Sequence, residues 1–114
     1  MAGPGVGGLG RLKKRAEFLA VAGRGRTHAR GSLLVQVLPQ GPVTRLGFTA
    51  TKKLGNAVVR NRAKRRMRAA ARMELAAVAG QDIVLVAREA IRLNSFAGLR
   101  ADLRAALDKL GVRR

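Results

Sequence analysis

Residues 52–68 concentrate positive charge in a short stretch, KKLGNAVVRNRAKRRMR, which contains eight Lys or Arg residues and no acidic one. A helix with 3.6 residues per turn would place polar and basic side chains on one side of this stretch and small apolar ones on the other. The polar side would comprise Asn61, Arg65 and Arg68, and would continue to Arg72 if the helix extends beyond the stretch. Like charges four residues apart repel each other on a helix, whereas phosphates that neutralise them release counterions. The stretch therefore predicts a basic helix face that binds nucleic acid rather than an ordinary solvated face.

The whole chain has the same charge bias, because its 114 residues carry a formal net charge of +18. No Asp or Glu occurs from Phe18 through Met73, where 13 Lys or Arg residues lie. So much uncompensated positive charge favours a polyanionic partner. Hydrophobic residues make up 47% of the chain and aromatic residues 3%, which fits one small core of aliphatic side chains.

Catalytic and metal-binding patterns are scarce in this sequence. It has no Cys, and its single His, His28, lacks a second proton-transfer group for acid–base cleavage. The six acidic residues are scattered, with no D-x-D or D-x-E pair to hold a divalent metal. We therefore expect neither a catalytic residue nor a metal ligand in this chain, and we expect any bond-breaking chemistry to come from a partner.

The order of apolar patterns predicts a small two-layer α+β domain with elements in the order α-β-β-β-α-β-α. We expect about four strands in one sheet, with helices on one face and an open second face. The turn PQGP after the second strand indicates a hairpin with the third, and Asn56 is placed to cap the middle helix. The expected helices are residues 11–22, 57–78 and 96–110, and the expected strands are 26–30, 32–38, 44–51 and 82–87. A single domain at residues 11–114 would follow a flexible, glycine-rich tail at residues 1–10.

The basic helix also carries a specific motif. The string GNAVVRNR at residues 55–62, with Lys52-Lys53 before it and Lys64-Arg65 after it, resembles the signature of the bacterial ribonuclease P protein family. The resemblance extends over nearly all of the chain from Arg11 to Leu110. Further similar segments are RLKK at residues 11–14 with Phe18 after it, RLGF at 45–48, and DIV at 82–84.

The resemblance implies both a fold and a function. The family's fold is a small α/β sandwich of the ribosomal-protein-like kind, with a left-handed βαβ crossover around the basic helix. Its members are accessory subunits of an endoribonuclease whose catalytic RNA removes the 5′ leader of precursor tRNA, with Mg²⁺ held by the RNA and the substrate. Two RNA partners are thus implied, the catalytic RNA and precursor tRNA. The positions implied to contact the catalytic RNA are Lys52, Lys53, Asn56, Arg60, Asn61, Arg62, Lys64, Arg65 and Arg68.

The resemblance also implies a cleft for the single-stranded leader, between the open sheet face and the first helix. The positions assigned to it are Phe18, Gln36, Arg11, Lys13 and Lys14. Phe18 can stack on an unpaired base, but Ala22 and Gln36 stand where the family often has further aromatic residues. We therefore expect leader binding to depend less on stacking and more on charge. Phe48 is expected in the core, since large apolar residues of strands are usually buried.

Two other classes of protein fit the composition. A ribosomal protein would share the size, the charge and the scarcity of aromatic residues, and a nucleoid-type DNA binder would bind duplexes with strong salt dependence. The motif at residues 55–62 favours ribonuclease P over both. The sequence contains neither an apolar run long enough for a membrane span nor a signal-peptide core near its start. We therefore expect a cytoplasmic protein with no membrane partner and no obligate protein partner.

Overall fold

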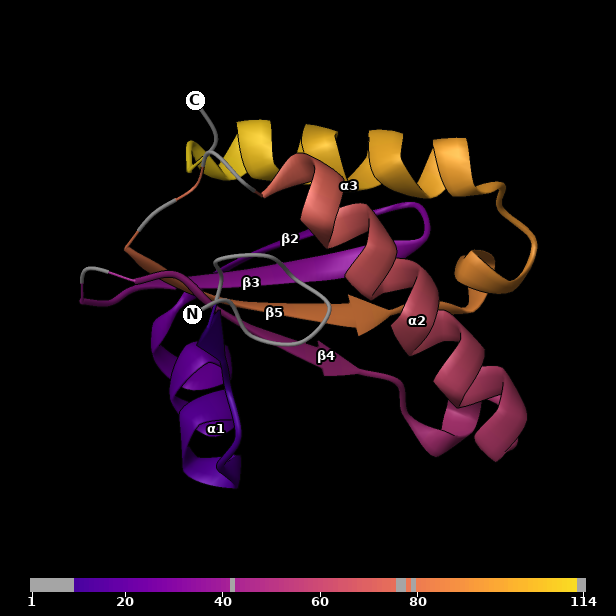
Figure 1. Ribbon diagram of the computed structural model, residues 1–114, viewed down its shortest axis with the longest axis horizontal. Coiled ribbons are helices and arrows are strands. Elements are labelled where there is room, and N and C mark those ends of the chain that lie inside the picture. The colour runs from indigo at the N-terminus through magenta and orange to yellow at the C-terminus, as the bar shows by residue number, and fades with distance from the viewer. Residues whose placement is uncertain (1–9, 42, 76–77, 79, 113–114) are drawn as a thin grey trace.

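The structure, a computed structural model, describes residues 10–41, 43–75, 78 and 80–112. These residues form a mixed sheet with three α-helices, which confirms the predicted α+β class (Figure 1). No helix within these ranges is both long and apolar enough to cross a membrane. The strands are β1 (Gly10–Arg11), β2 (Arg26–Arg30), β3 (Leu33–Pro39), β4 (Arg45–Thr49) and β5 (Gln81–Ala87). The helices are α1 (Arg15–Arg24), α2 (Ala57–Glu74) and α3 (Phe96–Leu110), with 3₁₀ turns η1 (Lys52–Leu54) and η2 (Glu89–Arg92).

Five strands form the sheet in the order β1-β4-β5-β3-β2, one strand more than expected. β2 and β3 form an antiparallel hairpin, β5 is antiparallel to β3, and β4 runs parallel to both β5 and β1. The prediction of a hairpin between residues 32–38 and 44–51 is therefore wrong, because β5 lies between β3 and β4 in the sheet. Four consecutive residues of β5, 82–85, are buried, and burial on both faces suits a central strand.

The chain passes from β4 through α2 to β5 with an uncommon hand. In Figure 1 both strands point to the right, β5 lies above β4, and α2 crosses on the near side of the sheet. If the picture is turned so that both strands point upward, β5 lies to the left of β4 and α2 lies in front of the sheet. A chain that moves to the left through a helix in front of the sheet forms a left-handed crossover. About 98% of such crossovers are right-handed, so the structure confirms a feature that only the family resemblance implied.

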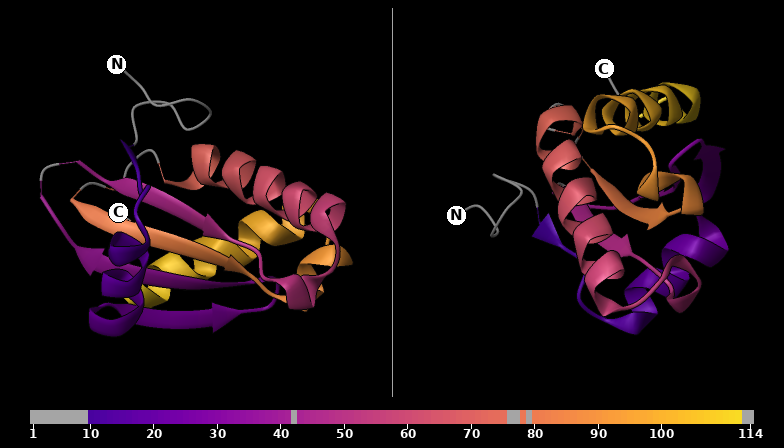
Figure 2. Two further views of the ribbon diagram at one scale, coloured as in Figure 1. Left: turned by 90° about the horizontal axis from the view of Figure 1, so that it is seen from below. Right: turned by 90° about the vertical axis from the view of Figure 1, so that its right-hand side faces the viewer.

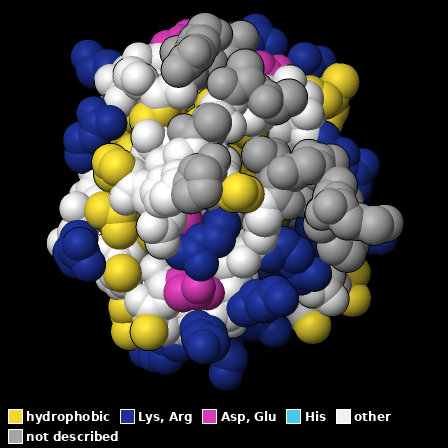
Figure 3. Space-filling view, turned by 60° about the vertical axis from the view of Figure 1, so that its left-hand side comes forward, with side chains coloured by type: hydrophobic (Ala, Val, Ile, Leu, Met, Phe, Trp, Pro, Cys, Tyr) yellow, Lys and Arg dark blue, Asp and Glu magenta, His cyan; other side chains and the backbone are white. Residues whose placement is uncertain are grey.

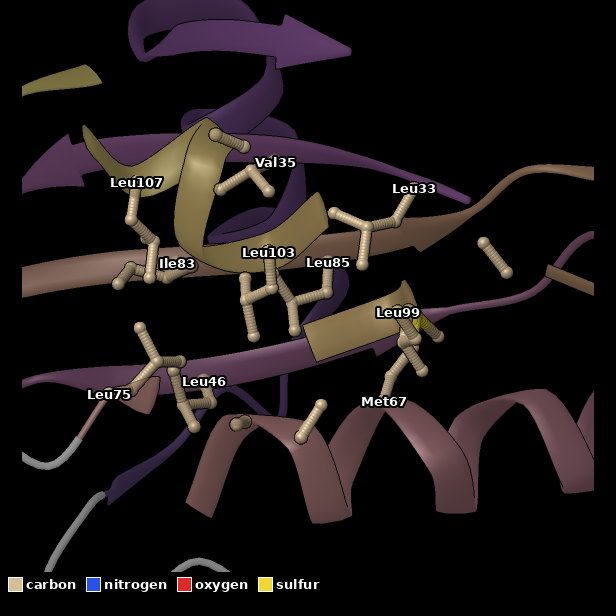
Figure 4. Packing of buried hydrophobic residues seen from close by; sticks show 14 of the residues in the cluster. Leu33, Val35, Leu46, Met67, Leu75, Ile83, Leu85, Leu99, Leu103 and Leu107 are labelled. Carbon is tan, nitrogen blue, oxygen red and sulfur yellow. The ribbon is translucent and has the colours of Figure 1, made fainter. Parts of the chain in front are cut away.

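The main hydrophobic core lies between one face of the sheet and helices α2 and α3 (Figure 4). Alternate residues of the strands point into it, among them Val35 of β3 and Leu85 of β5, as the two-residue period of a strand requires. Leu99 and Leu103 of α3 pack there at helical spacing. Helix α2 contributes Met67 and several alanines, so its opposite side is left free for polar residues.

Helix α1 lies on the opposite face of the sheet from α2 (Figure 2). Its buried residue Val21 forms a second, smaller cluster with Leu12 and Val84, and Phe18 packs against this cluster. The expectation that all helices share one face is therefore wrong. Because α1 has only ten residues, Leu34 on the same face of β3 remains half-buried.

Helix α1 begins at Arg15 rather than at residue 11, because the residues before it have other roles. Gly10–Arg11 pairs in parallel with β4 and forms β1, the strand that the sequence did not predict. Oε1 of Glu17 then accepts hydrogen bonds from the backbone N–H groups of Lys13 and Lys14, which satisfies donors at the start of the helix. The last residue of the expected flexible tail thus belongs to the sheet, and the rest of that tail lies outside the described residues.

Helix α2 begins where the sequence predicts. Oδ1 of Asn56 accepts a hydrogen bond of 3.0 Å from the backbone N–H of Val59, which confirms the predicted N-cap. The helix ends at Glu74 rather than near residue 78, because Leu75 leaves the helical conformation and is buried where the chain turns toward β5.

Helix α3 has the predicted bounds, Phe96–Leu110. Ser95 caps its start by accepting a hydrogen bond from the backbone N–H of Gly98, and Gly111 follows its end in the left-handed conformation with φ of 72°. The large apolar residues of α3, which recur at helical spacing, are buried from Leu99 onward, whereas the side chain of Phe96 is 37% exposed and lies outside the main core.

Candidate RNA-binding surface

Helix α2 presents a row of polar and basic side chains to solvent, which we call the basic ridge. Its exposed members are Asn61, Arg62 and Arg65, and its half-buried members are Arg60, Lys64 and Arg68. On the opposite side of the helix, Ala63 and Met67 are buried against the core, as the helical period requires. Part of the ridge borders a shallow depression of about 480 Å³ beside Val58. Of the α2 positions assigned from the sequence, Asn61, Arg62 and Arg65 are thus fully exposed, whereas Arg60, Lys64 and Arg68 are only partly exposed.

Two exposed lysines extend the ridge beyond the start of α2. Lys52 and Lys53 belong to η1, which ends at Gly55. Gly55 has φ of 153° and ψ of −164°, a conformation essentially restricted to glycine. A Cβ atom there would also stand 3.0 Å from Cβ of Val59. The sharp turn at Gly55 thus places both lysines next to the amino end of α2, where Asn56 is also exposed.

One arginine of α2, Arg66, points away from the ridge. Its Nη1 donates a hydrogen bond to the backbone carbonyl of Ile91, and its Nη2 donates to that of Asn94. The side chain of Arg66 is thus turned inward, whereas its neighbour Arg65 is exposed. Arg66 therefore ties α2 to the segment that leads into α3.

The ring of Phe48 lies beneath the ridge. The guanidinium of Arg68 stands 5.3 Å from the centroid of this ring, within range of a cation–π contact. Phe48 packs against the main core but remains half-buried, so its predicted place in the core is confirmed only in part. The contact holds the guanidinium of Arg68 over this ring.

Phe18 and Gln36, assigned to the leader cleft, lie on the same face of the sheet. Gln36 of β3 pairs with Val84 of β5, and Val84 pairs with Gly47 of β4, so the three residues form one row across the sheet. The ring of Phe18 packs over Gly47 at the end of that row. Since paired residues point to the same face, the aromatic ring and the amide side chain share the face that α1 partly covers.

The basic residues before α1 do not all join this face. Arg11 and Lys13 line a pocket of about 350 Å³ together with Phe18, and the pocket also reaches Arg68 of the basic ridge. Lys14 is the N-cap residue of α1, is exposed, and does not line the pocket. The structure thus connects the cleft face with the ridge through Arg11 and Lys13, and leaves Lys14 apart.

An arginine clamp fixes α1 on the sheet. Arg45 of β4 donates hydrogen bonds of 2.8 and 2.7 Å to the two carboxylate oxygens of Asp82 on β5. Its Nη1 donates a third, of 2.8 Å, to Oε2 of Glu17 on α1. The pKa of Glu17 lies below its ordinary value, first because the backbone N–H groups of Lys14 and Lys13 bond to it and then because of Arg45. The clamp therefore holds the start of α1, and with it Phe18, in a fixed position.

The structure contains a further basic pocket that the sequence did not predict. Its volume is about 460 Å³, and it lies between α2 and the segment from η2 to α3. Arg62 and Arg66 line it from α2, Arg92 from η2 and Phe96 from α3. The spacing of Phe96 matched the core stripe of α3, and no local pattern links Arg92 to α2. Only the folded chain brings these residues together.

The acidic side chains contribute little to these surfaces. Glu74 is buried between α2 and α3, where Arg100 and Arg104 bond to its carboxylate, and hydrogen bonding from Arg104 is the first cause of its lowered pKa. Among the described residues, no group of three or more His, Asp or Glu side chains could hold a metal ion. On the face that Figure 3 shows, acidic side chains occupy only small areas beside many Lys and Arg side chains. The surface is thus suited to binding polyanions.

Comparisons with known proteins agree over most of the chain. A family model described as Ribonuclease P matches residues 9–111. The ribonuclease P protein component of Gluconacetobacter diazotrophicus is 50% identical over 107 residues, which cover 90% of this chain and 92% of that protein. The component from Ruegeria pomeroyi is 46% identical over 110 residues, covering 90% and 87% respectively.

Solved structures show the same similarity. The RNase P protein of Staphylococcus aureus superposes with a TM-score of 0.82 at 28% identity, covering 91% of this chain and 97% of that one. The RNase P protein of Thermotoga maritima superposes with a TM-score of 0.74 at 29% identity, covering 88% and 94% respectively.

Proposed function

Since this chain belongs to the ribonuclease P protein family, we propose that it acts as the accessory protein subunit of ribonuclease P. In this role it binds the catalytic RNA and the 5′ leader of precursor tRNA, and the RNA cuts the phosphodiester bond that releases the leader. The membership favours this role over that of a ribosomal protein or a DNA-binding protein. It also implies action in the cytoplasm, where precursor tRNA is processed.

The observation that carries the proposal is the basic ridge on an apolar-backed helix. Its cations project from one rigid helix, and the ion pairs of the described residues involve none of them. Planar guanidinium groups suit phosphate oxygens, and each neutralised phosphate releases counterions. We infer that the catalytic RNA lies along the ridge and reaches η1 through Lys52 and Lys53.

The leader is proposed to bind on the opposite face, where Phe18 and Gln36 share a row. The ring of Phe18 is half-buried, so only part of it is free to stack on a base. Arg11 and Lys13 flank the ring and can neutralise the leader's phosphates. This arrangement supports leader binding in which charge contributes more than stacking.

The hydrolysis itself is assigned to the RNA. The described acidic residues do not form a set that fits Mg²⁺, and Glu17, Glu74 and Asp82 are already bonded to arginines. We therefore place Mg²⁺ on the RNA and the substrate, where it would supply Lewis-acid chemistry and activate water. The protein contributes binding and orientation of the two RNAs.

The test is reconstitution with ribonuclease P RNA and a labelled precursor tRNA. Cleavage at low Mg²⁺ should require the full-length protein. The double variant Lys64→Ala, Arg65→Ala should bind the RNA more weakly, and the slope of log affinity against log salt should fall by about 2. Arg30→Ala, which removes an exposed cation from the edge strand β2, should leave both measurements unchanged. Equal cleavage without the protein, or unaltered RNA binding by the double variant, would show that the proposal is wrong.

A further inference from the structure

The pocket between α2 and α3 combines cations and an aromatic ring around a space of about 460 Å³. This volume falls within the range of about 300–1,000 Å³ that is usual for small-ligand sites. Ala63 and Ile91 are buried at its apolar wall. The chain elements that meet there are α2, η2 and the first residue of α3, and we call the site the α2–α3 pocket.

The cations of this pocket lack acidic partners. Arg62, Arg66 and Arg92 line it, no Asp or Glu does, and none of the three forms an ion pair within the described part of the chain. Arg66 is held by two backbone carbonyls, and Arg92 donates to the backbone carbonyl of Leu54 at 3.3 Å. Carbonyl oxygens orient these guanidinium groups without cancelling their charge. The pocket is therefore preorganised for an anion.

The aromatic ring gives the pocket a second preference. Phe96 is the most exposed of the three phenylalanines, at 37%. Its backbone is fixed, because Ser95 caps α3 directly before it. An exposed ring on a rigid helix offers a surface on which a base can stack. A free inorganic anion would make no use of this ring.

We propose that the α2–α3 pocket binds one unpaired nucleotide of RNA, with its base stacked on Phe96 and its phosphate held by Arg62 and Arg92. This inference rests on the proposed function insofar as Arg62 also belongs to the basic ridge. An RNA strand that follows the ridge can therefore place a nucleotide in the pocket. Arg66, bonded to the segment that leads into α3, adds positive charge at the wall.

The first experiment uses the full-length protein labelled for NMR and titrated with a single-stranded adenosine pentanucleotide. The ring protons of Phe96 should shift upfield, and the side-chain signals of Arg62 and Arg92 should move with the same affinity. Phe96→Leu, which keeps the residue apolar, should weaken this local binding about tenfold, and Phe96→Trp should restore it. Leu93→Ala, which removes a 94% exposed side chain outside the pocket, should have no effect.

The second experiment separates a nucleotide site from a site for anions alone. Inorganic phosphate should move the arginine signals only weakly and leave the ring of Phe96 unchanged. If phosphate binds as tightly as the pentanucleotide, or if Phe96→Leu binds like the wild type, the inference is overturned. Failure of the proposed function would look different. The wild-type protein would then not bind ribonuclease P RNA, whatever the pentanucleotide does at Phe96.

Discussion

The ring of Phe18 lies so close to Gly47 that a Cβ atom at position 47 would stand 2.4 Å from Cε2 of the ring. Such an atom would also come within 3.2 Å of Cδ1 of Leu12. Glycine is therefore needed on β4 so that α1 can rest its aromatic ring directly on the sheet. The position of the ring in the proposed leader cleft depends on this contact between two elements.

Replacing this glycine tests the role of the contact. In Gly47→Ala the added methyl group must displace the ring of Phe18, and we expect the free energy of unfolding to fall by about 1–3 kcal/mol. The affinity of the reconstituted complex should fall for precursor tRNA but not for leaderless tRNA. Urea unfolding and binding assays with both RNAs measure the two effects.

Gly23→Ala is the matched control for this variant. Gly23 lies in α1, and a Cβ atom there would meet nothing within 4 Å. Replacing a glycine in the last turn of a helix by alanine should raise the free energy of unfolding by up to about 1 kcal/mol, with leader affinity unchanged. A Gly47→Ala protein as stable as the wild type, and equally selective for the leader, would contradict the assigned position of Phe18.

Truncating two neighbouring arginines of α2 should change two different properties, RNA binding in one variant and stability in the other. Arg65 is exposed on the basic ridge, whereas Arg66 bonds to two backbone carbonyls. Arg65→Ala should leave stability within about 0.5 kcal/mol and lower the salt slope of RNA binding by about 1. Arg66→Ala should lower the free energy of unfolding by about 1–3 kcal/mol, since the carbonyls of Ile91 and Asn94 lose their donor.

The two variants serve as controls for each other, because each removes one positive charge and the two positions are adjacent in the helix. Thermal unfolding and RNA titrations at several salt concentrations provide the comparison. Equal losses of stability in both proteins would mean that the basic ridge is part of the packed structure rather than a free surface.

The carboxylate of Glu74 should make the fold sensitive to acid. Its pKa lies below the ordinary value of 4.5, first because of hydrogen bonding from Arg104. A folded pKa below the unfolded one means that the ionised group stabilises the fold above the ordinary pKa, and that this contribution disappears as pH falls through the folded pKa. Glu74→Gln should therefore lower the free energy of unfolding at pH 7 by about 1–3 kcal/mol.

The difference between Glu74→Gln and the wild type should shrink once the pH falls below 4.5, as urea unfolding at a series of pH values would show. Glu89→Gln makes the same change of charge at an exposed residue of η2 and serves as the matched control. A constant difference at all pH values would indicate a packing defect instead of a lost ion pair.

Sequence patterns correctly predicted the features that depend on interactions between residues close together in the chain. The apolar residues of α3 recur at helical spacing, and Gly111 marks its end, so both of its bounds were correct. The cap at Asn56 and the outward face of α2 follow from the side chain of one residue and from the helical period. These features needed no knowledge of distant partners.

Features that depend on distant segments escaped prediction. The place of β5 between β3 and β4 is a choice of pairing partner, which strand periodicity does not encode. The start of α1 depends on Glu17, whose carboxylate reaches back to the chain before the helix and across to Arg45. The α2–α3 pocket likewise needs three separate segments, and the spacing of Phe96 alone indicated a core residue.

The arginine clamp gives a final prediction, because Arg45 joins Asp82 and Glu17 with one planar group. Lysine carries the same charge but cannot make this set of bonds. Arg45→Lys should lower the free energy of unfolding by about 2 kcal/mol and speed hydrogen exchange in α1. Leader affinity should fall with it, while binding of the catalytic RNA stays unchanged. Arg26→Lys, an exposed residue of β2, is the matched control, and unaltered exchange in α1 would refute the clamp's positioning role.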